Sequence, residues 1–195
     1  MRYLLRVERV LNSATTWVGR IGAWISVPLM IIIIFDVITR RFLVLGSTKL
    51  QEGEWHLHAV LFLLCLGFAY LKHAHVRISL VHERFSPTIQ RWIEFIGCLV
   101  FAIPYCAIVF YFALDFVERS WNLNEASDSA TGLPYRWAIK AFLPAGMLFL
   151  GVASIAVLLR KFIELFGSPE LRRAFKDEGP ERPVPPKPTM PGRER

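Results

Sequence analysis

The chain has 195 residues, of which 54% are hydrophobic and 20% are charged, and its formal net charge is +7. Its mean hydropathy of +0.40 disfavours an ordinary cytosolic enzyme. A nucleic-acid binder gathers its basic residues on a solvated face or in a motif, and the sequence shows neither pattern. A membrane surface therefore explains the positive charge better, and no nucleic-acid partner is expected.

Residues 1–20 contain the first predicted element. Apolar residues recur here in steps of three and four, which predicts an amphipathic helix that lies in the membrane interface. Its apolar face comprises Leu4, Val7, Leu11, Ala14 and Val18, and its polar face comprises Arg2, Arg6, Arg9 and Ser13.

Four apolar stretches follow. A helix needs roughly 20 residues to cross a hydrocarbon core of about 30 Å. The predicted spans are about 18–39, 54–72, 94–115 and 139–160, and the predicted transmembrane domain is 21–166. A soluble protein of 195 residues is too small to cover four helices that are apolar on all sides with polar layers. We therefore predict an all-α membrane protein with four transmembrane helices.

Two Ser-Pro pairs are helix-start signals, because a hydroxyl can cap a helix and proline suits its first position. Ser86–Pro87 opens a helix that runs into the third span, and Ser168–Pro169 opens a short cytoplasmic helix over 167–178. Residues 179–195 are rich in proline and charge and have no apolar period. This last segment is predicted to be disordered.

The distribution of lysine and arginine predicts the orientation. These residues are more abundant before the first span, in the second connection and at the start of the tail than in the other two connections. By the positive-inside rule, both termini are expected in the cytoplasm. The first apolar run is followed by Asp36 and Arg40 rather than by small residues of a cleavage site, so it is expected to remain as a signal anchor.

The polar residues indicate no catalytic centre. The three cysteines lie in apolar stretches without C-x-x-C spacing and are interpreted as buried small hydrophobes. All five histidines fall in the second span or the loop after it, which does not suit a haem held between two helices. Glu52 with His56, and Glu54 with His58, have a spacing that permits a divalent metal, but solvated residues at a membrane boundary are the favoured interpretation. No metal, cofactor or enzymatic activity is predicted.

Asp36 and Arg40 are the most informative polar pair. At i, i+4 near one end of the first span they can form an ion pair, which lowers the cost of placing an acid in the membrane. An acid that couples transport to protons or sodium would more naturally lie at the midplane. We therefore favour a structural or subunit-contact role for Asp36 over ion coupling.

Several short segments together resemble a known family. They are 35–42 (FDVITRRF), Glu52 and Glu54 at the start of the second span, 67–70 (GFAY), 75–78 (HVRI), 131–137 (TGLPYRW) and 142–146 (FLPAG). In this order and spacing they are similar to the small permease subunit of tripartite ATP-independent periplasmic (TRAP) transporters. One departure is Ser79, where many relatives carry an acid, and the proline-rich tail is also outside the pattern.

The resemblance implies a multi-pass subunit of the bacterial inner membrane that carries no substrate itself. Its partners would be a large multi-span permease subunit, which moves a carboxylate-bearing solute with sodium or protons, and a periplasmic solute-binding protein, besides membrane lipid. The residues implied in assembly with the large subunit are Asp36, Arg40, Glu54, His75, Arg77, Pro134 and Pro144. Arg41, Lys49, Arg119 and Arg136 lie in the predicted outer loops, where the binding protein would dock.

Alternatives remain open for some of these positions and for the function. His75 and Arg77 also fit a solvated cytoplasmic face, and Pro144 also fits a simple helix kink. The competing functions are a small homo-oligomeric exporter that uses Asp36 as its coupling acid, and a membrane redox subunit that uses the histidines.

Overall fold

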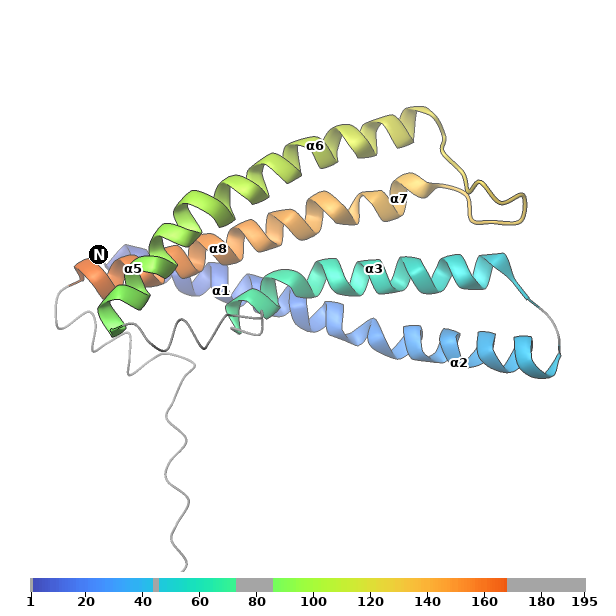
Figure 1. Ribbon diagram of the computed structural model, residues 1–195, viewed down its shortest axis with the longest axis horizontal. Coiled ribbons are helices and arrows are strands. Elements are labelled where there is room, and N and C mark those ends of the chain that lie inside the picture. Colours follow the sequence, from blue (N-terminus) through green and yellow to red (C-terminus); the bar gives the residue numbers. More distant parts are fainter. Residues whose placement is uncertain (1, 44–45, 73–85, 168–195) are drawn as a thin grey trace, which may run out of the picture.

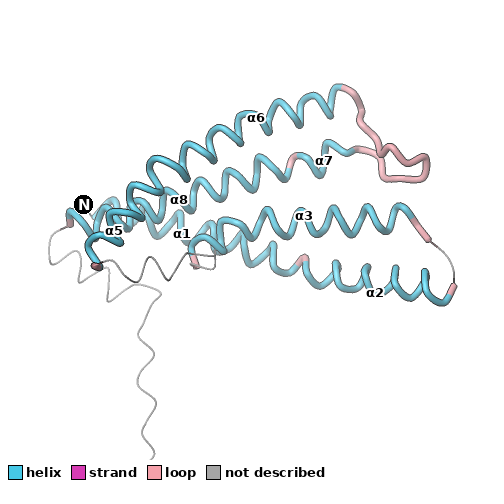
Figure 2. Tube along the Cα trace, in the orientation of Figure 1, coloured by secondary structure: helices cyan, strands magenta, loops and turns pink. Residues whose placement is uncertain are grey.

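The computed structural model describes residues 2–43, 46–72 and 86–167, and all regular structure within these ranges is helical (Figures 1 and 2). The elements are α1 (Arg2–Trp24), α2 (Ser26–Phe42), α3 (Thr48–Leu71), α5 (Pro87–Gly97), the π-helical segment η1 (Cys98–Ala102), α6 (Ile103–Asn122), α7 (Arg136–Lys140) and α8 (Phe142–Phe166). The predicted helix and tail after Gly167 lie outside the described residues, as do His75 and Arg77.

The helices join into four rods that are long and apolar enough to cross a membrane. They cover Tyr3–Phe42, Thr48–Leu71, Thr88–Asn122 and Arg136–Phe166. Lys140 and Arg160 lie twenty residues apart on the last rod with no charged residue between them, a distance of about 30 Å along a helix, which matches a hydrocarbon core. The prediction of an all-α protein with four apolar membrane-spanning helices is confirmed.

Three prolines account for the interruptions in these rods. Pro28 is the third residue of α2, and α1 ends at Trp24. Pro144 is likewise the third residue of α8, and α7 ends at Lys140. Pro104 directly follows the first residue of α6, where η1 ends. Proline has no N–H for the carbonyl four residues earlier and its ring displaces that carbonyl, so the regular helix is interrupted just before each proline.

The start of α5 agrees with the predicted Ser-Pro signal in position only. Ser86 precedes the first residue of the helix, Pro87, in an extended conformation. Its hydroxyl, however, makes no capping hydrogen bond. Proline at the first position lacks one of the N–H groups that are free at the start of a helix, so one group fewer needs a partner there.

Helix α8 lies at the centre of the bundle. It contacts α1, α3, α5 and α6, and in Figure 1 it runs between α6 and α3. A Cβ atom on Gly67 of α3 would lie 2.7 Å from the carbonyl oxygen of Phe149, and one on Gly146 of α8 would lie 3.0 Å from the carbonyl oxygen of Leu63. The two glycines therefore allow the backbones of α3 and α8 to pack directly against each other.

Helix α1 packs against both α3 and α8 and leads into α2 (Figure 1). Glu8, Thr15 and Gly19 are buried, whereas Tyr3 and Trp17 are exposed. The helix predicted over 1–20 thus extends to Trp24 and has one face packed on the bundle. Its position in the membrane interface stays a prediction.

The bundle has two ends, which we name by their residues. At the loop end, α2 finishes, α3 begins and residues 123–135 connect α6 to α7; at the terminus end, α1 and α5 begin and α8 finishes (Figure 1). The start of α1 and the finish of α8 therefore lie at the same end. That this end faces the cytoplasm stays a prediction.

Candidate functional site

Asp36 and Arg40 form the ion pair that their spacing predicted. Asp36 is only 3% exposed, and its Oδ2 accepts from Nη2 of Arg40 one helical turn further along α2. With the amide of Gln51 oriented so that its oxygen faces the guanidinium, that oxygen accepts from Nη2 at 2.7 Å and Nη1 at 2.9 Å. Arg40 therefore connects a buried acid of α2 to the first turns of α3.

Beside this pair lies an open groove between α2 and α3. It is lined by Asp36, Val37, Arg40, Arg41 and Glu54. The Oδ1 atom of Asp36 and the Oε1 atom of Glu54 are buried and have no hydrogen-bond donor among the described residues. Leaving such an acceptor without a donor costs about 1–3 kcal/mol, so two of them in one groove are a feature to be explained.

A second cluster holds the loop of residues 123–135 against α3. The Oε2 atom of Glu52 accepts from the backbone N–H of Leu133 at 2.6 Å, and its Oε1 atom accepts from the hydroxyl of Ser127. A Cβ atom on Gly132 would overlap the side chain of Ser127 and would lie 2.8 Å from Oε1 of Glu52, so only glycine fits where the loop crosses these two groups. The geometry makes Glu52 an anchor for the loop.

Sequence reasoning missed this role of Glu52. Its sequence context indicates only a weak metal pair with His56 and a place in the family resemblance. Glu52 and Leu133 are separated by 81 residues, so no local spacing connects them. The available signal was the presence of Glu52 and Gly132 in two of the segments that carry the resemblance.

The loop is also tied to the start of the last rod. The N–H of Arg136 donates to the carbonyl of Glu125 at 2.9 Å, and the carboxylate of Glu125 pairs with Lys140. This hydrogen bond from Lys140 holds the pKa of Glu125 below its usual range. Trp121 and Trp137 stack edge to face across the same connection, with ring centroids 4.5 Å apart.

The two predicted assembly prolines differ in their surroundings. Pro134 is exposed in the loop, one residue after the N–H that binds Glu52. Pro144 is buried within this chain in the first turn of α8, where α7 gives way to α8. The geometry at Pro144 therefore fits the helix-kink interpretation, and a partner contact there stays a prediction.

The four predicted docking residues are spread over the loop end rather than gathered into one site. Arg41 and Lys49 are exposed on either side of the α2–α3 connection. Arg119, at the end of α6, pairs with Asp115 at 2.7 Å, and Arg136 lies 3.6 Å from the carboxylate of an exposed loop aspartate, Asp128. Of these four residues only Arg41 lines the groove of Asp36 and Glu54.

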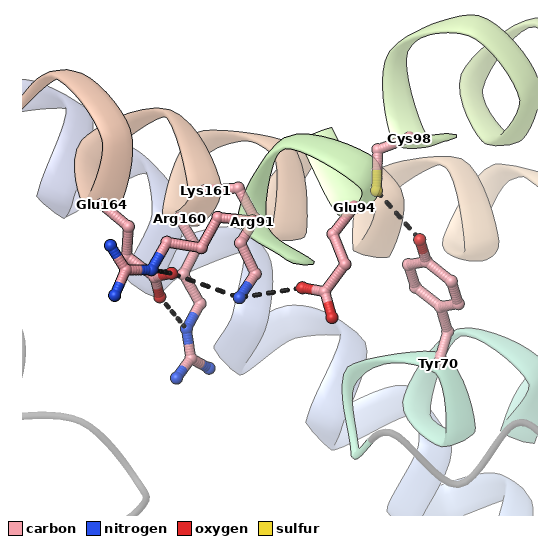
Figure 3. A network of polar contacts seen from close by, with 7 residues as sticks. All are labelled: Tyr70, Arg91, Glu94, Cys98, Arg160, Lys161 and Glu164. Atoms are coloured by element: carbon pink, nitrogen blue, oxygen red, sulfur yellow. Dashed lines mark hydrogen bonds and ion pairs between the residues drawn. The ribbon is translucent and has the colours of Figure 1, made fainter. Parts of the chain in front are cut away.

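Figure 3 shows a different kind of polar network at the terminus end. Lys161 of α8 lies 2.8 Å from the carboxylate of Glu94 on α5 and 3.2 Å from that of Glu164. Arg160 and Arg91 lie 3.4 Å and 4.0 Å from the carboxylate of Glu164. These charges join α5 to α8 where the apolar part of the bundle ends.

Histidines and cysteines take no part in a shared cluster in the part of the chain that the structure describes. No group of three or more His, Cys, Asp or Glu residues gathers there in a way that could hold a metal ion. Glu52, whose spacing from His56 permits a metal pair, is bonded to the loop. Cys98 is buried, and its sulfur lies 3.0 Å from the hydroxyl of Tyr70 (Figure 3).

Together, four apolar rods and charged residues at the two ends of the bundle define a multi-pass membrane protein. A sequence model of the family described as "Tripartite ATP-independent periplasmic transporters, DctQ component" matches residues 29–164. This match covers most of the chain, which therefore belongs to that family, and the resemblance drawn from the short segments is confirmed. Comparison with curated proteins finds no match.

Proposed function

We propose that this chain is the small membrane subunit of an ion-gradient-driven transporter for uptake of a carboxylate-bearing solute across a bacterial inner membrane. In this role it scaffolds the large permease subunit and helps to dock the periplasmic binding protein, with no catalysis of its own. Membership of the DctQ family supports the place of the chain in a TRAP transporter.

The observation that carries this proposal is the position of the charges. Within the described residues, the last two rods have no charged side chain between Glu94 and Asp115 or between Lys140 and Arg160. Asp36, the acid within α2, lies in the last two turns of that helix and is paired with Arg40. A carrier that couples transport to an ion gradient is expected to hold polar residues near the midplane, so this arrangement favours an accessory role.

The exposed apolar residues of α2 support a scaffold role. Met30, Ile31, Ile34 and Val37 are all exposed large hydrophobic residues, and α2 contacts the bundle mainly through α3 and α1. Such a face suits lipid or a helix of a second subunit. We assign Asp36, Arg40, Glu54 and Pro134 to contacts with the large subunit, and we retain Pro144 with His75 and Arg77 as weaker candidates.

The cationic residues at the loop end support a role in docking. Arg41, Lys49, Arg119 and Arg136 would attract an anionic patch of a binding protein, chiefly by raising the association rate. Replacing Arg119 and Arg136 with Glu should then slow uptake at low salt. Unchanged uptake at low salt would remove the docking role.

The scaffold proposal is tested by purifying the tagged chain from cells that also express the large permease and the binding protein of the same transporter. We expect the large subunit to co-purify, and we expect solute flux in liposomes only when all three components are present. Flux from this chain alone would overturn the proposal and favour the homo-oligomeric exporter. Absence of co-purification would overturn the scaffold role itself.

A further inference from the structure

The groove between α2 and α3 contains two carboxylate oxygens that face no donor. Asp36, which lines the groove, is nearly fully buried; its Oδ2 atom is paired, but its buried Oδ1 atom has no donor in the described chain. Glu54 of α3 also lines the groove, and its Oε1 atom is likewise buried without a donor among the described residues. Both groups are acceptors when ionised, so what the groove lacks is a donor.

The arginines of the groove do not supply it. Arg40 is directed to Oδ2 of Asp36 and to the amide of Gln51. Arg41 is exposed and forms no ion pair with either carboxylate in the structure. Because Arg40 is paired with Asp36 and Arg41 bonds to neither carboxylate, Glu54 has no ion-pair partner among the described residues of the groove.

The groove continues into an apolar face of α2 that could seat a helix. Met30, Ile33, Ile34 and Val37 follow one another in steps of three, one and three residues, which places them on one side of α2, and all four are exposed. Val37 also lines the groove. A transmembrane helix that packs along this face therefore passes the two free carboxylate oxygens near the end of α2.

We propose that the groove receives a lysine or arginine side chain from a transmembrane helix of the large permease subunit, which donates to Oδ1 of Asp36 and Oε1 of Glu54. This inference rests on the scaffold role proposed above and names the chemistry of the contact. A cation with several N–H donors satisfies both acceptors and neutralises Glu54 in one step. Its long apolar stem suits a path along the exposed face of α2.

The test compares substitutions of Glu54 in the co-expressed transporter. We expect Glu54→Lys to lower recovery of the large subunit by on the order of tenfold or more, because the groove would then repel a cation, and Glu54→Gln and Asp36→Asn to lower it by a smaller factor. Glu118→Lys and Glu118→Gln are matched controls, since Glu118 is an exposed carboxylate of α6 near the same end of the bundle. Both controls should leave recovery unchanged.

A suppressor screen then identifies the occupant. In the Glu54→Lys background, single Lys→Glu and Arg→Glu substitutions in the transmembrane helices of the large subunit should include one that restores recovery. Glu54→Gln keeps the test valid if Glu54→Lys does not fold, because it keeps the size of the side chain.

Two results would overturn the inference while leaving the scaffold role intact. The first is normal recovery of the large subunit with all Glu54 and Asp36 variants. The second is a loss of recovery that no basic-to-acidic substitution in the large subunit reverses. If recovery with the unmodified chain also falls when aminophospholipid is absent from the membranes of the expressing cells, the groove is assigned to a lipid headgroup. If the unmodified chain fails to recover the large subunit, the scaffold role fails instead.

Discussion

The two ends of the bundle use charged residues in different ways. At the terminus end, Lys161 joins Glu94 and Glu164, so that side-chain charges hold one helix to another. At the loop end, Glu52 binds the backbone N–H of Leu133 and the hydroxyl of Ser127, so that a carboxylate holds a loop in a fixed shape. The first arrangement depends on charge, and the second depends on geometry.

The difference indicates where specific recognition is expected. A network of ammonium, guanidinium and carboxylate groups tolerates small shifts of the helices, because its donors and acceptors can exchange partners. A carboxylate that is bonded to a backbone N–H next to a glycine tolerates much smaller shifts of the surrounding chain. The loop that this carboxylate orders contains Pro134 and leads to Arg136. Substitutions at the terminus end should therefore change the stability of the whole bundle, and those at the loop end should change local order.

The largest effect is expected for Lys161→Met. Lys161 and Glu94 are 14% and 15% exposed, so the substitution removes an ammonium group that lies 2.8 Å from a largely buried carboxylate. We expect a loss of about 2 kcal/mol in the free energy of unfolding in detergent, between the values typical of exposed and of buried pairs. In the double variant Lys161→Met, Glu94→Gln, much of this loss should be recovered, because the buried carboxylate charge is also removed.

The matched control is Arg119→Met at the loop end, which removes an ion pair whose two members are both at least half exposed. This change should cost less than about 0.5 kcal/mol. Equal losses for Lys161→Met and Arg119→Met would remove the distinction between the two ends.

A smaller and local effect is expected for Glu52→Ala. Without the acceptor, the N–H of Leu133 should exchange with deuterium faster by on the order of tenfold, while the unfolding midpoint of the bundle changes little. Asp128→Ala is the control, because this carboxylate belongs to the same loop but is 99% exposed. Unchanged exchange at Leu133 in Glu52→Ala would show that the loop is held by something other than this carboxylate.

Local patterns predicted much of the fold and part of the site. The spans follow from the length of the apolar stretches, and the Asp36–Arg40 pair follows from a spacing of four residues within one helix. The helix that contains residues 1–20 was also predicted, although it extends further, because the break before Pro28 rather than the end of the apolar period decides where it stops.

Contacts between distant segments were not predictable in the same way. In a membrane protein, hydropathy does not separate residues that face lipid from those that face another helix, since both surroundings are apolar. The close approach of Gly67 to Phe149 and the bond of Glu52 to Leu133 depend on how the rods are arranged. The unfilled groove of Asp36 and Glu54 likewise exists only after α2 has packed on α3.

The smallest effect is a pH dependence of the loop. The hydrogen bond from Lys140 lowers the pKa of Glu125, so its contribution is fully present above the ordinary glutamate pKa of about 4.3 and is lost as the pH falls through the lowered value. We therefore expect the N–H of Arg136, which donates to the carbonyl of Glu125, to keep its protection above about pH 4.3 and to lose it as the pH falls further, after correction for the intrinsic exchange rate. In Glu125→Gln this protection should start lower and change less with pH, because the titrating group is absent. An equal pH dependence in both proteins would assign the change to other carboxylates of the loop end, such as Glu52, and would leave that residue as the main tie between loop and bundle.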